Sequence, residues 1–401
     1  METSLWILFA LTLLSLLEAV CSLQGGFRFR ELFRRHSGRP VADFQPAAAL
    51  IVPCRGLDPG FRDNLRAFFE QDYPEFHLIL ITGDPDDPCA QPLQELRQDF
   101  PAVSSQLLFA GAAAGRSQKV HNLLCALTAL RPRDKVLAFG DSDIRPGSHW
   151  LRHLVGTLQD SNAGMATGFR WYVPQKGNPA SVLRAVWNVG IASLLSEKDS
   201  LFAWGGAMAI RRSVFRKCRI PDAWKGALSD DYAISRALRQ RGRSGHFQPH
   251  CLSLSLEDCQ FKELFSWSYR QLAITRVYHP SLWKAALATQ LVNSLSLWGG
   301  FAILTLGVPA GLTLPVPAFL WGSMVAAIYL LGCWKAGLRL QAASLIHPGL
   351  GKRHRLAFLT LGPVASLITL LALMRSMFSR TIEWRGIRYR MDSPGKTEVL
   401  E

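Results

Sequence analysis

The sequence predicts an α/β domain with a mainly parallel sheet, set between apolar helices long enough to cross a membrane. Three observations predict it. Short apolar runs alternate with helical patterns over residues 45–260, residues 5–17 are almost purely apolar in a stretch that extends to about residue 22, and three more apolar stretches occupy the last third of the chain. Alternation of this kind favours parallel strands joined by helices. About 20 apolar residues are enough to span a bilayer as a helix.

The elements of the α/β block follow one another in a regular order. Strands are predicted, as short apolar runs, over Ala48–Pro53, Leu78–Thr82, Gln106–Ala110, Lys135–Gly140 and Ala163–Phe169. Helices are predicted, from apolar residues at helical spacing, over Asp63–Gln71, Pro92–Asp99, Lys119–Ala129 and Ser148–Leu158. Together they define a domain over 45–260.

The first apolar stretch is typical either of a signal peptide or of an uncleaved anchor. Its start, Met-Glu-Thr-Ser, carries no Lys or Arg, which disfavours a signal peptide. We therefore predict an anchor over 1–23 and a basic linker over 24–44. The acidic start and the basic exit (Arg28, Arg30, Arg34 and Arg35) predict that residues 24 onward, with the domain, lie in the cytoplasm.

The last third predicts a membrane-interface segment over 261–284, about three membrane helices over 285–378 and a basic tail over 379–401. The apolar stretches lie near 286–308, 314–334 and 356–377. Three spans after a cytoplasmic domain would put the C-terminus outside. However, the tail contains five basic residues that the positive-inside rule would keep inside: Arg380, Arg385, Arg388, Arg390 and Lys396. The sequence leaves this conflict open.

The charge and the cysteines narrow the class of partner. The chain has 45 Lys and Arg against 30 Asp and Glu, and the basic residues cluster beside the apolar stretches. That placement favours anionic membrane lipid, and no RNA-type aromatic motif or zinc-finger spacing indicates nucleic acid. The eight cysteines include no Cys-x-x-Cys pair, which predicts a reduced domain without structural disulfides.

Three acidic clusters follow predicted strands. Asp141-Ser142-Asp143 comes directly after the apolar run 136–140, Asp84 opens a second cluster, and Asp230-Asp231 forms the third. Ligands of open α/β sheets bind at the carboxyl ends of the strands. Two carboxylates one residue apart can hold a divalent cation and, through it, a diphosphate. The alternative for any one cluster is a solvated turn with an Asx hydrogen bond.

Ordered motifs give the chain a resemblance to a known family. They are Pro53-Cys-Arg55-Gly56-Leu-Asp58-Pro59 with Asn64-Leu65, Gln71-Asp72-Tyr73-Pro74, Asp84-Pro-Asp86-Asp87-Pro88, Ser117-Gln118-Lys119-Val120 with Asn122-Leu123, Asp141-Ser142-Asp143, Trp204-Gly205-Gly206-Ala207-Met208, Ser229-Asp230-Asp231-Tyr232, and Glu383-Trp384-Arg385-Gly386 with Tyr389-Arg390. The chain thereby resembles the inverting membrane glycosyltransferases with the A-type nucleotide-diphospho-sugar fold, and among them the ceramide glucosyltransferase group. The resemblance covers about 45–280 and the tail.

The resemblance implies a role for each matching position. It implies that Asp231 is the catalytic base, that Asp141 and Asp143 bind Mg²⁺ or Mn²⁺, and that Asp84 lies on the uridine side of a UDP-sugar donor. It implies further donor-binding residues, Pro53, Lys119 and Asp141, and acceptor-binding residues, Trp204, Gly205 and Gly206. The acceptor implied is a membrane lipid such as ceramide, and the sugar implied is glucose. The family's Gln/Arg-x-x-Arg-Trp motif lacks its Arg-Trp here; Gln271 and Arg276 are the substitutes we predict for donor binding.

Two other functions stay open from the sequence. A processive polysaccharide synthase shares the catalytic domain, but it needs more membrane spans for a channel and a complete Arg-Trp motif. A non-catalytic membrane scaffold with the same fold is compatible with the missing motif, although all three acidic clusters are present. Replacement of Asp231 by Asn is expected to separate catalysis from binding.

Overall fold

The computed structural model describes residues 2–198, 200 and 202–400. The chain divides into two compact units. The first, here called the helical unit, comprises Met1–Arg34, Lys176–Ser193 and Asp258–Ser379. The second, the α/β unit, comprises Arg35–Gln175, Leu194–Glu257 and Arg380–Glu401.

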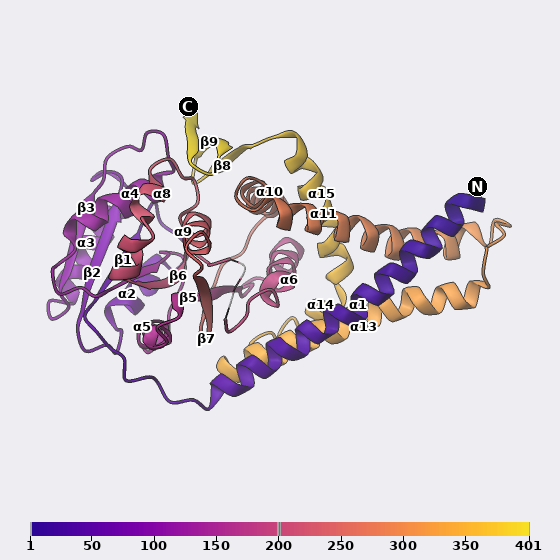
Figure 1. Cartoon of the computed structure of the whole chain (residues 1–401), viewed down its shortest axis with the longest axis horizontal. Coiled ribbons are helices and arrows are strands. Elements are labelled where there is room, and N and C mark those ends of the chain that lie inside the picture. The colour runs from indigo at the N-terminus through magenta and orange to yellow at the C-terminus, as the bar shows by residue number, and fades with distance from the viewer. Residues whose placement is uncertain (1, 199, 201, 401) are drawn as a thin grey trace. The chain divides into compact units, whose positions relative to one another are not determined.

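A seven-stranded sheet forms the centre of the α/β unit (Figure 1). Its strands are β1 (Ala48–Pro53), β2 (Phe76–Thr82), β3 (Ser105–Phe109), β4 (Val136–Gly140), β5 (Ala163–Tyr172), β6 (Ala207–Arg211) and β7 (Ser244–Ser255). The spatial order is β3-β2-β1-β4-β6-β5-β7. β1 to β4 pair in parallel, as do β5 and β7, whereas β6 is antiparallel to both β4 and β5. The predicted α/β fold with a mainly parallel sheet is therefore confirmed.

Helices and short turns connect these strands. The helices are α2 (Phe61–Phe69), α3 (Ala90–Asp99), α4 (Gln118–Ala126), α5 (Trp150–Gly156), α7 (Arg212–Lys217), α8 (Ile220–Trp224) and α9 (Asp230–Arg239). A single core cluster joins β1, β2 and β4 to α2, α3 and α5, with Leu50, Phe68, Leu93 and Leu154 fully or almost fully buried. The four predicted connecting helices, 63–71, 92–99, 119–129 and 148–158, correspond to α2, α3, α4 and α5, the last two extended by 3₁₀ turns.

The C-terminal tail, residues 380–400, also belongs to the α/β unit. It folds into a three-stranded antiparallel sheet of β8 (Thr381–Trp384), β9 (Ile387–Ser393) and β10 (Lys396–Leu400). Arg385 and Gly386 connect β8 to β9, and both have positive φ, 54° and 76°. A two-residue turn with positive φ at both positions matches the right-handed twist of a hairpin.

The helical unit contains the apolar stretches. Its helices are α1 (Glu2–Ser37, of which the part up to Arg34 belongs to this unit), α6 (Pro179–Ala192), α10 (Phe261–Tyr278), α11 (Pro280–Ser294), α12 (Gly300–Ala302), α13 (Ala318–Ile346), α14 (Arg355–Thr360) and α15 (Gly362–Phe378). Two π-helical segments, Leu295–Gly299 and Ile303–Gly307, continue α11 and α12. Among the described residues, Glu2–Ser37, Pro280–Gly307 and Ala318–Ile346 are long and apolar enough to cross a membrane.

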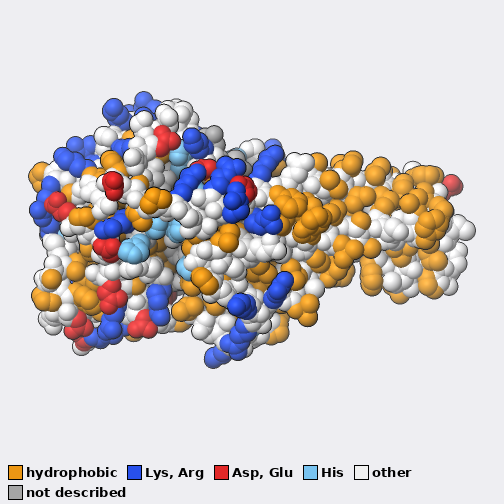
Figure 2. All heavy atoms as spheres, turned by 90° about the horizontal axis from the view of Figure 1, so that it is seen from below, with side chains coloured by type: hydrophobic (Ala, Val, Ile, Leu, Met, Phe, Trp, Pro, Cys, Tyr) orange, Lys and Arg blue, Asp and Glu red, His pale blue; other side chains and the backbone are white. Residues whose placement is uncertain are grey.

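The surface formed by the three long apolar helices is mostly hydrophobic (Figure 2). Trp6, Leu17, Leu306, Phe319 and Leu330 are among its exposed apolar side chains, as expected of helices that face lipid. Polar side chains instead meet between the helices. Trp321 donates to the Thr12 hydroxyl at 3.2 Å, and Ser15 donates to Asn293 Oδ1 at 2.5 Å. Such contacts hold membrane helices together.

The structure gives the helix bounds within two of the predicted segments. The predicted linker 24–44 is helical as far as Ser37, because α1 continues through the basic segment that follows the apolar run. The predicted third C-terminal span, 356–377, is broken into α14 and α15 at Leu361. Pro363 lies in the first turn of α15. Because proline has no backbone N–H, α14 cannot continue through this position as a regular helix. With 17 residues, α15 measures about 26 Å, less than the roughly 30 Å of a hydrocarbon core.

The two compact units bear on the conflict over the C-terminus. The tail and the large sheet lie in one unit, so we expect an even number of crossings between residues 257 and 380. Two helices in that stretch, Pro280–Gly307 and Ala318–Ile346, are long and apolar enough to cross a membrane. We therefore predict that the basic tail lies on the same side of the membrane as the sheet, as its charge also predicts.

Candidate active site

The predicted metal-binding pair begins where β4 ends. β4 is fully buried and pairs in parallel with β1. It ends at Gly140, so Asp141 lies at the carboxyl ends of these strands. Asp143 follows two residues later, and its carbonyl accepts a hydrogen bond of 3.1 Å from Ser255 Oγ at the end of β7. Parallel pairing therefore places the two aspartates where ligands of such sheets bind.

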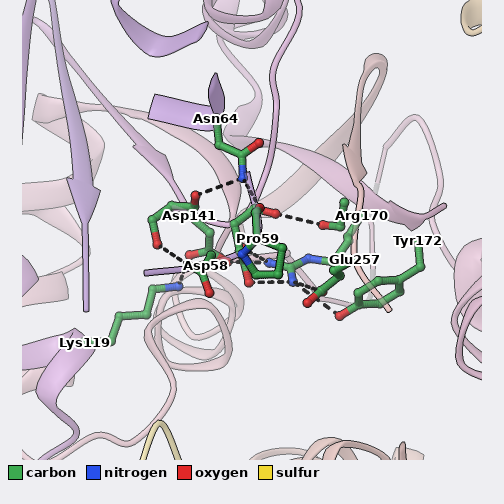
Figure 3. Close-up of polar contacts among 12 residues, drawn as sticks. Asp58, Pro59, Asn64, Lys119, Asp141, Arg170, Tyr172 and Glu257 are labelled. Atoms are coloured by element: carbon green, nitrogen blue, oxygen red, sulfur yellow. Dashed lines mark hydrogen bonds and ion pairs between the residues drawn. The ribbon is translucent and has the colours of Figure 1, made fainter. Parts of the chain in front are cut away.

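Lys119 joins two of the three predicted acidic clusters. It lies in the first turn of α4, whose N-cap is Ser117. Its Nζ is 2.7 Å from Asp141 Oδ1 and 3.3 Å from Asp230 Oδ1 (Figure 3 shows the contact with Asp141). Burial disfavours the charged amine, but Asp141, Asp230 and Asp231 outweigh burial and raise the pKa of Lys119. The amine is thus a fixed positive charge.

Arg170, on β5, bridges the Asp141–Asp143 pair. Its guanidinium contacts both oxygens of Asp143, at 2.6 and 2.9 Å, and Asp141 Oδ2 at 3.1 Å. It also lies over the rings of Trp204 and Tyr172, at 5.1 and 5.5 Å. Burial disfavours ionised Asp143, but Arg170, Arg385 and Lys119 outweigh burial and lower its pKa. The two carboxylates therefore converge on a positive charge.

Asp230 and Asp231 lie in the first turn of α9, after α8 and not after a strand as predicted. Their surroundings contrast. Asp231 Oδ2 accepts from the Gly205 N–H at 3.0 Å, and its Oδ1 accepts from the Tyr232 N–H at 2.7 Å and from the Ser229 hydroxyl. Asp230 is 2% exposed, and its Oδ2 has no hydrogen-bond partner among the described residues. Burial raises the pKa of Asp230 to about 6, with Asp231 and Asp141 adding to the rise and Lys119 opposing it.

The predicted acceptor residues Trp204, Gly205 and Gly206 lie beside these carboxylates. A Cβ on Gly205 would lie 2.6 Å from Asp230 Oδ2 and 2.9 Å from Lys119 Nζ. A Cβ on Gly206 would lie 2.7 Å from Asp141 Oδ2 and 2.2 Å from the Trp204 ring. Both positions require glycine for the close packing of the site itself, before any ligand is considered.

The other predicted donor residues are more dispersed. Pro53 is the last residue of β1. Asp84 follows β2, is exposed, and accepts a hydrogen bond of 2.9 Å from the Asp86 N–H. Gln271 and Arg276 lie on α10 of the helical unit. There the Arg276 guanidinium donates to the Ser376 carbonyl and lies 5.6 Å from the centre of the Trp283 ring.

The structure adds residues to which the sequence assigned no role. Arg385 of the tail contacts both carboxylate oxygens of Asp58, at 2.6 and 3.0 Å, and lies 3.6 Å from Asp143. Asp58 also accepts a hydrogen bond of 3.0 Å from Ser142 Oγ. Asp58 and Arg385 stand within the quoted motifs, so their motifs were a signal, whereas no local pattern distinguishes Arg170.

The carboxylates of Asp141 and Asp143 are suited to hold a divalent cation. Both already contact one positive group, the guanidinium of Arg170. Among residues 2–198, 200 and 202–400, no group of three or more His, Cys, Asp or Glu side chains is arranged as a complete metal site. Mg²⁺ commonly takes only one or two carboxylates and completes its coordination with substrate phosphates and water. Two aspartates therefore suffice, provided that Arg170 moves away.

A mixed α/β sheet with carboxylates gathered at its strand ends is the architecture of a nucleotide-diphospho-sugar transferase domain. More particularly, the model of glycosyl transferase family 21 matches residues 7–397, and the chain belongs to this family.

Curated relatives carry related names at low identity. Ceramide glucosyltransferase 3 of Caenorhabditis elegans is 21% identical over 210 residues, which cover 51% of this chain and 45% of that protein. Ceramide glucosyltransferase 1 of the same organism is 23% identical over 227 residues, 55% of this chain and 48% of that protein. The chain spans about half the length of these curated relatives. The similarity to the ceramide glucosyltransferase group is thereby confirmed.

Solved structures resemble the chain more distantly. The mannosyltransferase PcManGT from Pyrobaculum calidifontis, in complex with GDP-Man and Mn²⁺, is 15% identical with a TM-score of 0.47, and the match covers 92% of this chain and 98% of that one. Glucosyl-3-phosphoglycerate synthase from Mycobacterium tuberculosis is 13% identical with a TM-score of 0.38, covering 60% and 84%. Values this low say nothing about donor, acceptor or metal.

Proposed function

We propose that the protein transfers a hexose, glucose in the first instance, from a UDP-sugar to the hydroxyl of a ceramide-like membrane lipid, with inversion to a β-glycoside. The observation that carries the proposal is the convergence of Lys119, Asp141, Asp230 and Asp231 at one edge of the sheet. Membership of glycosyl transferase family 21 supports the reaction class. The names of the curated relatives support the donor sugar and the lipid acceptor.

Asp231 is the proposed catalytic base. Hydrogen bonds from Gly205, Tyr232 and Ser229 orient its carboxylate, and it is more exposed than Asp230. The carboxylate accepts the proton of the lipid hydroxyl, and the hydroxyl oxygen forms a bond to the anomeric carbon. The bond from that carbon to the β-phosphate oxygen breaks, and UDP leaves with the electron pair. Attack opposite to the leaving group gives inversion.

The leaving diphosphate needs positive charge. Asp141 and Asp143 are the proposed ligands of Mg²⁺ or Mn²⁺, which supplies that charge when bound. Lys119 and Arg170 place two further cations at the same edge of the sheet. A guanidinium can hold phosphate oxygens bidentately, so Arg170 is suited to contact the diphosphate once it leaves the aspartates.

The remaining site assignments belong to the same proposal. Asp84 and Pro53 lie at the ends of β2 and β1, on the proposed uridine side. Gln271 and Arg276 are proposed donor contacts, and Trp204, Gly205 and Gly206 are proposed to face the acceptor. The basic second half of α1 and the basic tail support a cytoplasmic position for the α/β unit.

The test is a transfer assay on membranes that contain the full-length chain, with several radiolabelled UDP-sugars and a lipid extract. We expect one labelled glycolipid, formed only with a divalent cation. Asp231→Asn should abolish its formation while UDP binding stays close to wild type. Asp222→Asn, an exposed aspartate paired with Arg219 and Lys225, is the matched control and should keep full activity.

Other outcomes would contradict the proposal. A labelled polymer would identify a processive polysaccharide synthase. Absence of both transfer and UDP release, with UDP still bound, would favour a non-catalytic scaffold. Normal turnover of the Asp231→Asn variant would remove Asp231 from the role of base.

A further inference from the structure

The C-terminal tail reaches the candidate active site from a remote part of the chain. Residues 258–379 of the helical unit separate it in sequence from the rest of the α/β unit. Nevertheless, the tail makes three separate contacts with that unit, through Arg385, Tyr389 and Gly395. Each contact meets a residue in, or close in sequence to, one of the acidic clusters or Lys119.

The first contact is the bidentate pair of Arg385 with Asp58. Arg385 also donates to the Arg55 carbonyl at 3.2 Å and lies 3.6 Å from Asp143. Asp58 in turn accepts from the hydroxyl of Ser142, the middle residue of Asp141-Ser142-Asp143. Arg385 is therefore coupled to the proposed metal pair in two ways, directly through Asp143 and indirectly through Asp58 and Ser142.

The second contact is a buried hydrogen bond. The hydroxyl of Tyr389, a residue that is 2% exposed, accepts from the Gln118 N–H at 3.1 Å. Gln118 immediately precedes Lys119, whose amine contacts Asp141 and Asp230. The tail thus contacts the backbone of the first turn of α4, from which the side chain of Lys119 extends to Asp141 and Asp230.

The third contact is a close approach of two backbones. A Cβ on Gly226 would lie 1.9 Å from the carbonyl oxygen of Gly395, in the turn between β9 and β10. No side chain fits there unless the tail moves. Gly226 comes three residues before Ser229, the N-cap of α9. The tail therefore packs against the segment that leads into α9, at a residue outside the acidic cluster.

We propose that the tail is a working part of the donor site, in which Arg385 is a positioning residue that fixes Asp58, Ser142 and Asp143 for binding of the nucleotide diphosphate. The proposal rests on the function proposed above. A planar guanidinium suits this position because it contacts both oxygens of Asp58 and still reaches Asp143. An ammonium group keeps the charge but cannot make the bidentate pair.

The test measures binding of UDP with Mn²⁺ to full-length protein in detergent, together with the KM values for UDP-sugar and for lipid. We expect Arg385→Ala to weaken UDP binding about ten- to a hundred-fold, the usual effect of removing a partner that orients a ligand-binding carboxylate. The KM for UDP-sugar should rise in parallel, and the KM for lipid should stay unchanged. Arg385→Lys should recover only part of the loss. Arg388→Ala, at an exposed arginine of the same sheet, is the charge-matched control and should bind like wild type.

A second variant tests the tail without touching Arg385. Gly226→Ala should displace the tail and weaken UDP binding in the same direction, although every charged residue is present. If Arg385→Ala fails to fold, Gly226→Ala and Arg385→Lys carry the test. Wild-type UDP binding and donor KM in these variants would overturn the role of the tail while leaving the transferase proposal intact. Failure of the wild-type protein to bind any UDP would instead overturn the transferase proposal itself.

Discussion

Asp230 and Asp231 are neighbours in sequence, yet their carboxylates differ in burial and in hydrogen bonding. Asp231 accepts hydrogen bonds on both oxygens. Asp230 is buried against Lys119 with one oxygen unpartnered among the described residues. Hydrogen bonds stabilise an ionised carboxylate, whereas burial destabilises it. The pair therefore combines an oriented, solvent-accessible carboxylate with a buried one whose charge depends on pH.

The raised pKa of Asp230 predicts a pH dependence of stability. Its pKa is about 6 in the folded protein and near 3.8 in the unfolded chain, so the folded protein binds more protons between these values. Stability contributed by Asp230 is therefore present at low pH and is lost as pH rises from about 4 to about 6, by up to roughly 3 kcal/mol. Asp230→Asn removes this dependence. The difference in unfolding temperature between variant and wild type should favour the variant more at pH 7 than at pH 5. An equal difference at both values would contradict the shift.

Arg170 predicts an effect on metal binding. In the structure its guanidinium engages three of the four oxygens of Asp141 and Asp143, so a divalent cation must displace it. Arg170→Ala should therefore bind Mn²⁺ more tightly than wild type, by several-fold, because the competing charge is gone. Electron paramagnetic resonance of free Mn²⁺ measures this directly in the purified protein. Asp143→Ala should abolish the tighter binding. Weaker Mn²⁺ binding by Arg170→Ala would show that the arginine supports the metal and does not exclude it.

Residue patterns predict only part of this site. Asp141, Asp143 and Lys119 could be singled out because each stands at the edge of a regular element within a short motif. Arg170 could not be assigned, because its carboxylate partner Asp143 lies 27 residues away and nothing local distinguishes it from a surface arginine. Arg385 stands in a quoted motif, but its partner Asp58 lies 327 residues away, so the motif alone gave it no role. The charge balance of the site is thus a property of the folded chain.

At the scale of elements, long uniform patterns were predicted and short mixed ones were missed. The five apolar runs became β1 to β5. Burial on both faces requires the continuous apolar sequence of β1, β2, β4 and β5, whereas β3 is a half-buried edge strand. β6 was missed because its five residues follow Trp204-Gly205-Gly206, which resembles a loop. β7 contains polar and proline residues, β8 has only four residues, and β9 and β10 carry several charged side chains. Such strands are specified by the partners beside them more than by their own composition.

Close pairing of β5 with β7 predicts a strict requirement for glycine at position 168. A Cβ there would lie 2.2 Å from the Cys251 carbonyl and 2.8 Å from the Ala207 Cβ. Both contacts are rigid, so Gly168→Ala should lower the unfolding temperature markedly. Gly147→Ala, where a Cβ meets nothing within 4 Å, is the matched control and should unfold like wild type. Thermal unfolding of both variants in detergent makes the comparison, and equal values would mean that the two strands separate easily.

At the scale of the whole molecule, the assignment of membrane spans predicts a definite topology. One crossing by α1 and two by Pro280–Gly307 and Ala318–Ile346 place the two termini on opposite sides of the membrane. Epitope tags at either end, tested for protease protection in sealed vesicles, check this. We expect the C-terminal tag to be digested together with the α/β unit and the N-terminal tag to be protected. Protection of both tags, or of neither, would require α15 to be a further span or α1 not to cross.

The position of β8 to β10 after the helical unit also sets the order in which the parts of the α/β unit are made. A ribosome synthesises the large sheet and the described helices before residues 380–400, which include Arg385. A nascent chain that ends at Ser379 contains Lys119 and the acidic clusters around Asp141 and Asp230, but it lacks the strands that contact this part of the α/β unit. Premature stop codons between residues 380 and 400 would therefore leave a product with a complete large sheet and an unfinished proposed donor site. Synthesis of residues 380–400 would be the step that brings Arg385 to Asp58.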